Sequence, residues 1–459
     1  MVCKFLQKGK VKMQNSAKFF RNTDCQYFPC HQGLDEGCFN CLFCYCPLYS
    51  KNPCPGNATY IKKEDGRLIK RCTDCIFPHK AENYEKIMKL LRVKKEAGLG
   101  EEYHHGGENE TKACSLDFSV NVNPLGLPES VKSAVKNSLD SCEKYPDQNC
   151  RRLRKKIALK IQHEFGLGVQ DEQIVCGNGA SELISLAVNA ISPKDALLIA
   201  PTFYGYERAL KICDCRLHYH FLDKGQDFDL DETIFDSIEK VSPDMVLLCN
   251  PNNPTGRMVN PGLFEKILRA CKEKDIFLLV DECFIDFTER AGESALRFVG
   301  GSPHLIVLNA FTKIFAMAGL RLGYIISANA GLIQKINSLR PEWNVSTLAQ
   351  VAGESALAET DYIREARVLI GVERLFLLKE LKALGLKVYP TEANFILFAV
   401  EAPELAERLE SYLRENGIFL RNCGNFIGLD GRFFRVAVRT HQENIRLIEK
   451  IRELFFKDS

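Results

Sequence analysis

The sequence predicts an α/β protein with a mostly parallel sheet covered on both faces by helices, followed by a smaller α+β part and preceded by a small cysteine-rich domain. Three observations lead to this prediction. Short apolar runs alternate with helical segments through the middle of the chain, which is typical of β–α–β units. Beyond about Asn344, an alternation of helix and strand resumes. Ten of the 20 cysteines lie before Lys80, whereas the others are scattered singly through the rest of the chain.

The strands expected in the large sheet share one pattern, a short apolar run bounded by turn residues. Such runs are typical of parallel strands, because helices cover both faces of a parallel sheet. The runs that fit are Ile174–Cys176, Ala196–Ala200, Met245–Cys249, Ile276–Val280, Leu305–Leu308 and Tyr324–Ser327. Since ligands bind beyond the carboxyl ends of parallel strands, functional residues are expected just after these runs.

The domain boundary is expected at a polar stretch. Residues 94–112 contain four glycines, many charges and no apolar periodicity, which is typical of a linker. A short helix is predicted just before it, at Tyr84–Arg92. The predicted division is a cysteine-rich domain at 1–95, a linker at 96–112 and a domain at 113–459, whose large part spans about 145–340 and whose small part combines about 113–144 with 345–459.

The cysteines of the first domain have the spacing of metal ligands. A Cys-x-x-Cys-x-x-Cys-x-Cys run begins at Cys38, and a separate Cys-x-x-Cys pair begins at Cys72, with His79 close behind. A segment this short and this rich in Gly, Pro and charge buries too little apolar surface to fold unaided, so bound metal is expected to stabilise it. The predicted ligands are Cys30, Cys38, Cys41, Cys44, Cys46, Cys54, Cys72 and Cys75.

The metal expected at these cysteines is zinc, with enough ligands for two sites. An iron–sulfur cluster is the alternative, because clustered thiolates suit either metal, and the spacing does not assign individual cysteines to a site. Disulfides would also stabilise a small domain, but Met1–Gln14 contains lysines and no apolar core, so we expect no secretory signal. The segment resembles the cysteine-rich small domain found in some prokaryotic proteins, and this resemblance implies metal binding.

The charge and hydropathy of the chain argue against two classes of partner. There are 61 Lys and Arg residues against 59 Asp and Glu, so the chain has no electrostatic basis for binding nucleic acid or an anionic membrane. No apolar run approaches the length of a membrane span. With reduced cysteines and no targeting signal, the expected location is the cytoplasm.

The segment Ala310–Tyr324, AFTKIFAMAGLRLGY, carries the strongest chemical signal in the chain. Lys313 lies in an apolar stretch, where burying a free ammonium is so costly that the lysine must find a partner or lose its charge. A lysine with a lowered pKa is the nucleophile needed for a Schiff base with an aldehyde cofactor. Arg321 presents a fork of donors suited to a phosphate. The alternative is a helix end whose two cations extend into solvent.

Three further groups match the same chemistry and lie at strand ends. Asp281 follows the run Ile276–Val280 and supplies the acid that an electron-sink pyridine needs at its ring nitrogen. The turn Cys176–Glu182 leads from a strand into a helix, so its backbone N–H groups and the Ser181 hydroxyl suit a cofactor phosphate. Asn253, in a proline-rich turn after another predicted strand, offers its amide to a phenolic oxygen. Each motif alone has a structural explanation, but their order and placement together argue against coincidence.

These motifs resemble those of the fold-type I pyridoxal-phosphate (PLP) enzymes, specifically the class I/II aminotransferase superfamily, over roughly residues 104–459. The resemblance implies that Lys313 is the Schiff-base lysine and the acid and base at the substrate's α-carbon. It also implies that Asp281 pairs with the pyridine nitrogen and that Asn253 donates to the phenolic oxygen. The implied contacts of the cofactor phosphate are Gly179, Ala180, Ser181 and Arg321.

The resemblance further implies a stacking residue, a dimer and a substrate clamp. Phe203 corresponds to the aromatic side chain that stacks on the cofactor ring. Tyr145 corresponds to a tyrosine that reaches the cofactor phosphate of the neighbouring subunit, which implies a homodimer. Arg435 corresponds to the arginine that holds the substrate's α-carboxylate.

Two positions depart from the superfamily pattern. Phe284 stands where most of these aminotransferases have a tyrosine, so Asn253 is left as the donor to the phenolic oxygen. Weaker stabilisation of that oxyanion should raise the pKa of the Schiff base. Ala310 stands where a serine or threonine usually contacts the phosphate, so one phosphate contact is expected to be missing.

Several stretches resemble one branch of the superfamily, the threonine-phosphate decarboxylases of cobalamin biosynthesis, which form aminopropanol phosphate. Besides Phe284, these stretches are His105–Gly107, Asp117–Gly126, Arg421–Leu429, and Arg435–Arg439 with Glu443 and Asn444. The histidinol-phosphate aminotransferases share the cofactor-binding positions and Arg435, so transamination remains the alternative. A third hypothesis is a non-enzymatic regulator that binds the cofactor, but the chain has no helix-turn-helix pattern and no basic stripe.

A substrate with both a carboxylate and a phosphate offers two anchors, and arginine binds either group bidentately. The predicted substrate contacts are Arg435, Arg421, His105 and Asn123. An ordinary surface ion pair is the alternative for Arg421, and a linker histidine without a role is the alternative for His105.

Overall fold

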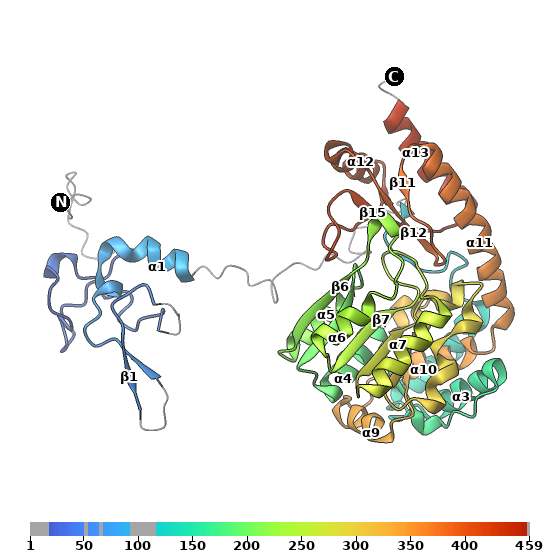
Figure 1. Cartoon of the computed structure of the whole chain (residues 1–459), viewed down its shortest axis with the longest axis horizontal. Helices are drawn as coiled ribbons and strands as arrows, with labels where there is room; N and C mark the ends of the chain where they lie inside the picture. Colours follow the sequence, from blue (N-terminus) through green and yellow to red (C-terminus); the bar gives the residue numbers. More distant parts are fainter. Residues whose placement is uncertain (1–17, 50–53, 64–67, 92–115, 457–459) are drawn as a thin grey trace. The chain divides into compact units, whose positions relative to one another are not determined.

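The computed structural model describes residues 18–49, 54–63, 68–91 and 116–456 (Figure 1). The chain divides into two compact units, Met1–Tyr103 and His104–Ser459. The predicted substrate residue His105 lies outside the described residues. None of the helices in the described ranges is both long enough and apolar enough to cross a membrane.

The described part of the first unit has little regular structure and a small core. Its described elements are the 3₁₀ turns η2 (Glu36–Cys38), η3 (Phe77–His79) and η4 (Ala81–Asn83), the strands β1 (Thr59–Lys62) and β2 (Leu68–Arg71), and the helix α1 (Tyr84–Leu91). The two strands form an antiparallel hairpin in which Thr59 lies opposite Arg71. Phe39, Leu48 and Ile87 are the large apolar side chains that are fully buried here. So few buried apolar groups agree with the expectation that this unit needs a further source of stability.

The second unit contains a seven-stranded sheet. In spatial order its strands are β4 (Ile174–Gly177), β10 (Gly323–Ile326), β9 (Leu305–Ala310), β8 (Phe277–Asp281), β7 (Met245–Cys249), β5 (Asp195–Ala200) and β6 (Arg216–Phe221). Strand β10 runs antiparallel to both neighbours, and the pairs among β9, β8, β7, β5 and β6 are parallel. The six predicted strands are confirmed. Strand β6 was not predicted, because it is an edge strand whose polar residues break the apolar run.

Helices cover both faces of this sheet (Figure 1). Alternate residues of one strand enter different cores: Leu197 packs in the core on one face and Leu198 in the core on the other. One face carries α4 (Ala180–Ile191), α5 (Gly205–Ile212) and α9 (Ala330–Leu339). The other carries α3 (Arg151–Phe165), α6 (Ile234–Val241), α7 (Pro261–Glu273) and α10 (Thr347–Ala356), with α2 (Glu129–Asn137) packed on α10. This two-sided burial explains the continuous apolar runs.

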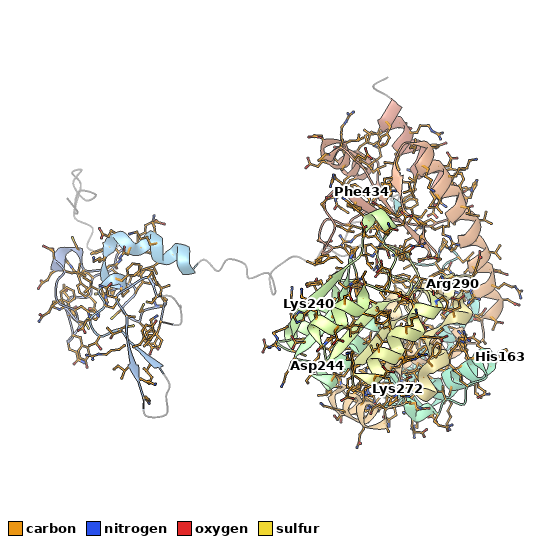
Figure 2. All side chains as sticks on the ribbon, viewed as in Figure 1. His163, Lys240, Asp244, Lys272, Arg290 and Phe434 are labelled. Carbon is orange, nitrogen blue, oxygen red and sulfur yellow. The ribbon has the colours of Figure 1, made fainter. Side chains whose placement is uncertain are left out.

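The last part of the chain forms a smaller sheet. Its antiparallel strands, in spatial order, are β11 (Lys387–Val388), β12 (Phe395–Ala399), β15 (Phe433–Ala437) and β14 (Arg421–Asn422). Helices α11 (Thr360–Ala383), α12 (Pro403–Glu415) and α13 (His441–Phe456) accompany it, and β3 (Leu116–Asp117) pairs in parallel with β13 (Ile418–Phe419). Figure 2 labels Phe434, which is buried in this part and stacks on Phe398, whereas the labelled His163 and Lys272 are exposed.

Candidate active site

The carboxyl ends of three neighbouring strands bring the predicted cofactor residues to one edge of the large sheet. Cys249, at the end of β7, lies opposite Asp281, at the end of β8, and the Asn250 N–H donates to the Asp281 carbonyl at 2.8 Å. Strand β9 ends at Ala310, and the short helix α8 (Phe311–Ile314), which contains Lys313, follows at once. Parallel pairing therefore gathers residues that lie far apart in the sequence.

Lys313 is partly buried and has cationic neighbours. Burial disfavours its ammonium, and the charges of Arg435 and Arg321 add to this effect, so its pKa is lowered to about 8. The ammonium lies 6.0 Å from the centre of the Phe284 ring. A lysine with this pKa is partly neutral near physiological pH, and the neutral amine is the nucleophile for an aldehyde.

Asp281 is buried and held by two donors. The Tyr206 hydroxyl donates to Oδ2 at 2.7 Å, and the Cys283 N–H donates to Oδ1 at 3.0 Å. Burial raises the pKa of Asp281, and these hydrogen bonds and the Lys313 charge oppose the rise. An acid in this setting is suited to pair with a cationic ring nitrogen. Tyr206 was not identified from the sequence, because there it looks like an ordinary residue on the apolar face of a helix, near the start of that helix.

The start of α4 forms a candidate phosphate site. The helix follows Gly179, which has a positive φ of 85° and no side-chain cap, so the first N–H groups of the helix have no partner within it. A Cβ at Gly179 would lie 2.7 Å from Nη2 of Arg321, which shows that the guanidinium lies directly against the helix start. Backbone donors, the helix dipole and a guanidinium therefore converge here, and each favours an anion.

The other residues predicted to contact the phosphate also lie at this helix start. Ala180 and Ser181 are the first two residues of α4. Ala310 is buried, its N–H is bonded to the Asn309 side chain at 2.8 Å, and it has no hydroxyl to offer. As the sequence predicts, the Ala310 side chain therefore cannot supply a contact to the phosphate.

Arg435 lies in the middle strand pair of the small sheet, where it is buried. Its Nη1 donates to Oδ1 of Asn253 at 2.5 Å, and its Nη2 donates to the Ser119 carbonyl at 2.7 Å. Its Nε is buried without a hydrogen-bond partner, and the two hydrogen bonds that its guanidinium forms within the described residues go to an amide oxygen and a backbone carbonyl, not to a carboxylate. Burial lowers its pKa to about 10. A buried guanidinium without an acidic partner is costly, so it is suited to an anionic ligand.

The hydrogen bond from Arg435 also fixes the orientation of the Asn253 amide. Since its Oδ1 accepts from Arg435, the group that remains for another partner is the Nδ2 donor, which a phenolic oxygen requires. The neighbouring Asn252 ties this turn to the end of β5, because its Nδ2 donates to the Pro201 carbonyl at 2.9 Å. Phe203 follows that strand and packs edge-on to Tyr206, with ring centroids 5.5 Å apart.

Arg421 lies directly opposite Arg435, because β14 and β15 pair in antiparallel register. It is buried, and its guanidinium donates to the Asn422 carbonyl and to Oδ1 of Asn425, both at 2.8 Å. The guanidinium also lies 5.3 Å from the centre of the Phe426 ring. It is therefore not the surface arginine that the sequence left open as an alternative.

Two of the residues predicted to bind cofactor or substrate contact other residues of their own chain. Tyr145 is 78% exposed and stacks on Trp343, with ring centroids 4.4 Å apart. Asn123 is buried, and its Nδ2 donates to the Ile314 carbonyl at 2.7 Å while its Oδ1 accepts from the Leu125 N–H at 3.1 Å. In this structure the Asn123 side chain thus holds the backbone beside Lys313, and its predicted contact with substrate stays a prediction.

The first unit holds a group of possible metal ligands. The ligand atoms of Cys30, His31 and His79 all lie within 4.8 Å of one another. The two histidines were not among the predicted ligands. Cys38 was, but it forms a disulfide bond in this structure, and the thiolate that a metal requires is then not available.

Comparison with known proteins gave matches for both units. The profile of the family described as aminotransferase class I and II matches residues 115–451, and that of the cysteine-rich small domain matches residues 16–98. The threonine-phosphate decarboxylase of Salmonella typhimurium is 35% identical, over 74% of this chain and 91% of its own length. The adenosylcobalamin biosynthesis bifunctional protein CobDQ of Leptospira interrogans is 34% identical, over 77% of this chain and 41% of its own length. The structure of the histidinol-phosphate aminotransferase from Clostridium acetobutylicum has a TM-score of 0.68 and 34% identity, and the match covers 74% of this chain and 99% of that one.

Proposed function

The chain belongs to the aminotransferase class I and II family, and we propose that it uses PLP to decarboxylate L-threonine O-3-phosphate to (R)-1-aminopropan-2-yl phosphate in cobalamin biosynthesis. The observation that carries this proposal is the pair of buried arginines, Arg421 and Arg435, on adjacent strands of the small sheet. Two neighbouring buried cations are suited to a substrate with two anionic groups. The similarity to a threonine-phosphate decarboxylase over most of both chains supports the same substrate.

The residues at the strand ends fit this cofactor. The start of α4 after Gly179, together with Arg321, suits its phosphate, and Asp281 suits its ring nitrogen. Lys313 supplies the amine for its aldehyde, and Asn253 presents a donor to its phenolic oxygen. When bound, PLP withdraws electrons from the α-carbon of an amino acid, so that a bond to this carbon breaks more easily.

The protein decides which bond breaks by orienting the substrate. Arg435 would hold the α-carboxylate, and Arg421 would hold the phosphate, so that rotation about the α-carbon is restricted. With PLP bound, the bond that these two arginines orient perpendicular to its ring would be the one that breaks. Lys313, with its lowered pKa, can then deliver a proton to the α-carbon after the carboxylate has left.

A product assay tests the proposal. Purified protein loaded with PLP is given threonine phosphate, with and without 2-oxoglutarate. Carbon dioxide and aminopropanol phosphate formed without the keto acid would support decarboxylation. Turnover of histidinol phosphate only when 2-oxoglutarate is present would overturn it in favour of the second candidate, a histidinol-phosphate aminotransferase, to which the 34% identical solved structure points.

The lowered pKa of Lys313 predicts how the protein without cofactor captures PLP. The rate is expected to rise with pH through about 8, because the neutral amine attacks the aldehyde and the ammonium does not. In Arg435→Met the midpoint should move to higher pH, since one of the cations that lowers the pKa is gone. Stopped-flow absorbance across a pH series measures both. A flat profile, or a midpoint that moves down, would contradict this assignment.

We also propose a homodimer in which Tyr145 acts on the partner's site, because its exposed ring has no role in the described site of its own chain. Co-expressed Lys313→Ala and Tyr145→Ala chains are then expected to recover activity, although neither variant is active alone. Only the mixed dimer has a site with both residues intact, so about a quarter of wild-type activity should return. If Tyr145 served its own chain, mixing would restore nothing, and the mass measured by light scattering checks the dimer itself.

We propose that the metal of the first unit is zinc. We also propose that the protein is located in the cytoplasm. Cysteines in the described part of the first unit are free thiols apart from Cys38, and sulfur with imidazole nitrogen is a donor set that zinc prefers. Metal analysis of purified protein tests this, because iron together with acid-labile sulfide would indicate a cluster instead.

A further inference from the structure

Tyr145 and Trp343 form a stacked pair of aromatic side chains in the second unit. Their ring planes are inclined by 24°, and their centroids lie 4.4 Å apart, which is close contact for two aromatic rings. Tyr145 is the more exposed of the two, so burial does not determine the direction of its ring. The indole of Trp343 is the surface against which the tyrosine ring lies, and it belongs to the single tryptophan of the chain.

The backbone at both positions is restricted. Tyr145 precedes Pro146, whose ring disfavours a helical conformation of the residue before it, so the tyrosine backbone has little freedom. Trp343 has a φ of 52°, in the left-handed region, which a bulky residue adopts only where its surroundings hold it there. The remaining freedom of the pair is the rotation of Tyr145 about its side-chain bonds, and stacking selects one of these rotamers.

Two hydrogen-bonding side chains fasten the loop that follows the tyrosine to the segments on either side of Trp343. Nη1 of Arg340 donates to the Gln148 carbonyl at 2.7 Å. Nε2 of the buried Gln350 donates to the Asp147 carbonyl at 2.9 Å. Because the two segments are held at a fixed separation, the stacked rings belong to the built structure of this region and are not a chance contact between mobile side chains.

The residue after Trp343 also reaches the candidate phosphate site of its own chain. Nδ2 of Asn344 donates to Oε2 of Glu182 at 2.6 Å, and the same oxygen accepts from the Asn178 N–H at 2.6 Å. Two roles are therefore open for Trp343, support of its own phosphate turn or support of Tyr145. The contacts favour the second, because the turn is held through the neighbouring asparagine, whereas the indole itself lies on the tyrosine ring.

We propose that Trp343 is a positioning residue that holds Tyr145 in the orientation in which it reaches the cofactor phosphate of the partner subunit. This inference rests on the proposed homodimer, and it is independent of whether the bound substrate is decarboxylated or transaminated. A tyrosine without the stack would spend less time in that orientation, and the apparent affinity for PLP falls with the fraction of chains in the competent state. The strength of an aromatic pair corresponds to about a 2- to 13-fold change in this fraction.

Titration of the cofactor-free protein with PLP, followed by the absorbance of the Schiff base, tests the role of the indole. Trp343→Ala and Trp343→Leu should bind PLP about 2- to 13-fold more weakly, whereas Trp343→Phe retains an aromatic face and should bind like the wild type. Trp343→Ala combined with Tyr145→Ala should be no weaker than Tyr145→Ala alone, because the indole acts through the tyrosine. Leu375→Ala is the control, since it removes an exposed apolar side chain of α11 outside the candidate site and should change nothing.

Heterodimers purified through two different affinity tags show which of the two sites Trp343 serves. With Trp343→Ala and Tyr145→Ala in the same chain and a wild-type partner, we expect one weak PLP site and one site of wild-type affinity. With the two substitutions in opposite chains, we expect two weak sites, because each site then depends on a missing or a misplaced tyrosine. If Trp343 supported its own phosphate turn, the two heterodimers would give the reverse result, and the inference would be overturned.

Failure of the homodimer and failure of this inference have different signatures. A monomer in light scattering, or unchanged PLP affinity in Tyr145→Ala, would overturn the homodimer and this inference with it. A dimer in which Tyr145→Ala weakens PLP binding and Trp343→Ala does not would overturn this inference alone. The fluorescence of the single tryptophan reports the stack without any change at Trp343, and it is expected to differ between the wild type and Tyr145→Ala. Identical emission from the two proteins would count against the stack.

Discussion

Lys313→Arg is expected to abolish decarboxylation of threonine phosphate. Guanidinium keeps its charge near neutral pH, so it can neither form the Schiff base nor transfer a proton at the α-carbon. Lys313 is partly neutral because burial and the neighbouring arginines lower its pKa to about 8. Loss of positioned acid and base catalysis alone costs about 10²- to 10⁴-fold in rate, and loss of the covalent step adds to this. The release of carbon dioxide measures the rate.

The matched control is Lys335→Arg on α9, where the lysine is exposed and is not among the residues of the candidate site. This variant should retain wild-type activity. Lys313→Arg should still bind PLP, because the phosphate site at Gly179 and Arg321 is unchanged, but the absorbance of the Schiff base should be absent. If activity fell less than tenfold, the amine of Lys313 would not be the catalytic group.

Arg421→Gln is expected to remove the preference for a phosphorylated substrate. The guanidinium is buried on the small sheet beside Arg435, and a phosphate paired with it would form charge-assisted hydrogen bonds. Removing one partner of such a buried pair costs about 2–5 kcal/mol, which corresponds to roughly 30- to 5,000-fold in kcat/KM. The comparison of threonine phosphate with threonine measures the effect, because the second substrate lacks the group that Arg421 would hold.

Two controls give this experiment its specificity. Arg432→Gln changes an arginine near the same sheet that is more exposed and paired with Asp430, so the substrate preference should not change. Arg435→Gln should reduce kcat/KM for threonine and threonine phosphate alike, because both substrates carry the α-carboxylate. If Arg421→Gln lowered activity on both substrates equally, Arg421 would serve the structure of the sheet and not the phosphate.

Much of the large domain could be predicted from local sequence. The apolar runs of β4, β5, β7, β8, β9 and β10 are visible because helices bury both faces of those strands, so almost every residue in them is apolar. Strand β6 was missed, since an edge strand needs no such run. Its Arg216 and His218 instead bind Asp195 on the adjacent strand.

The resemblance to the fold-type I PLP enzymes also predicted the fold correctly, and the similar solved structure confirms it over the second unit. Lys313, Asp281 and Gly179 could be proposed from the sequence because each lies at the end of a strand or within a few residues after one, and such positions are encoded by short segments. Tyr206 was not, although its hydroxyl holds Asp281. A tyrosine 75 residues away in the chain shows no local sign of that contact.

The sequence by itself determined the order of the elements, the family and the residue types available for chemistry. Only the tertiary structure decided which of them meet. The β14–β15 register places Arg421 opposite Arg435, and the packing of the η3 turn against the Cys30 loop brings His79 next to Cys30. The local sequence pattern indicates whether a residue is buried and which backbone conformation it prefers. The partner across a sheet or a loop depends on long-range packing, which short stretches of sequence do not encode.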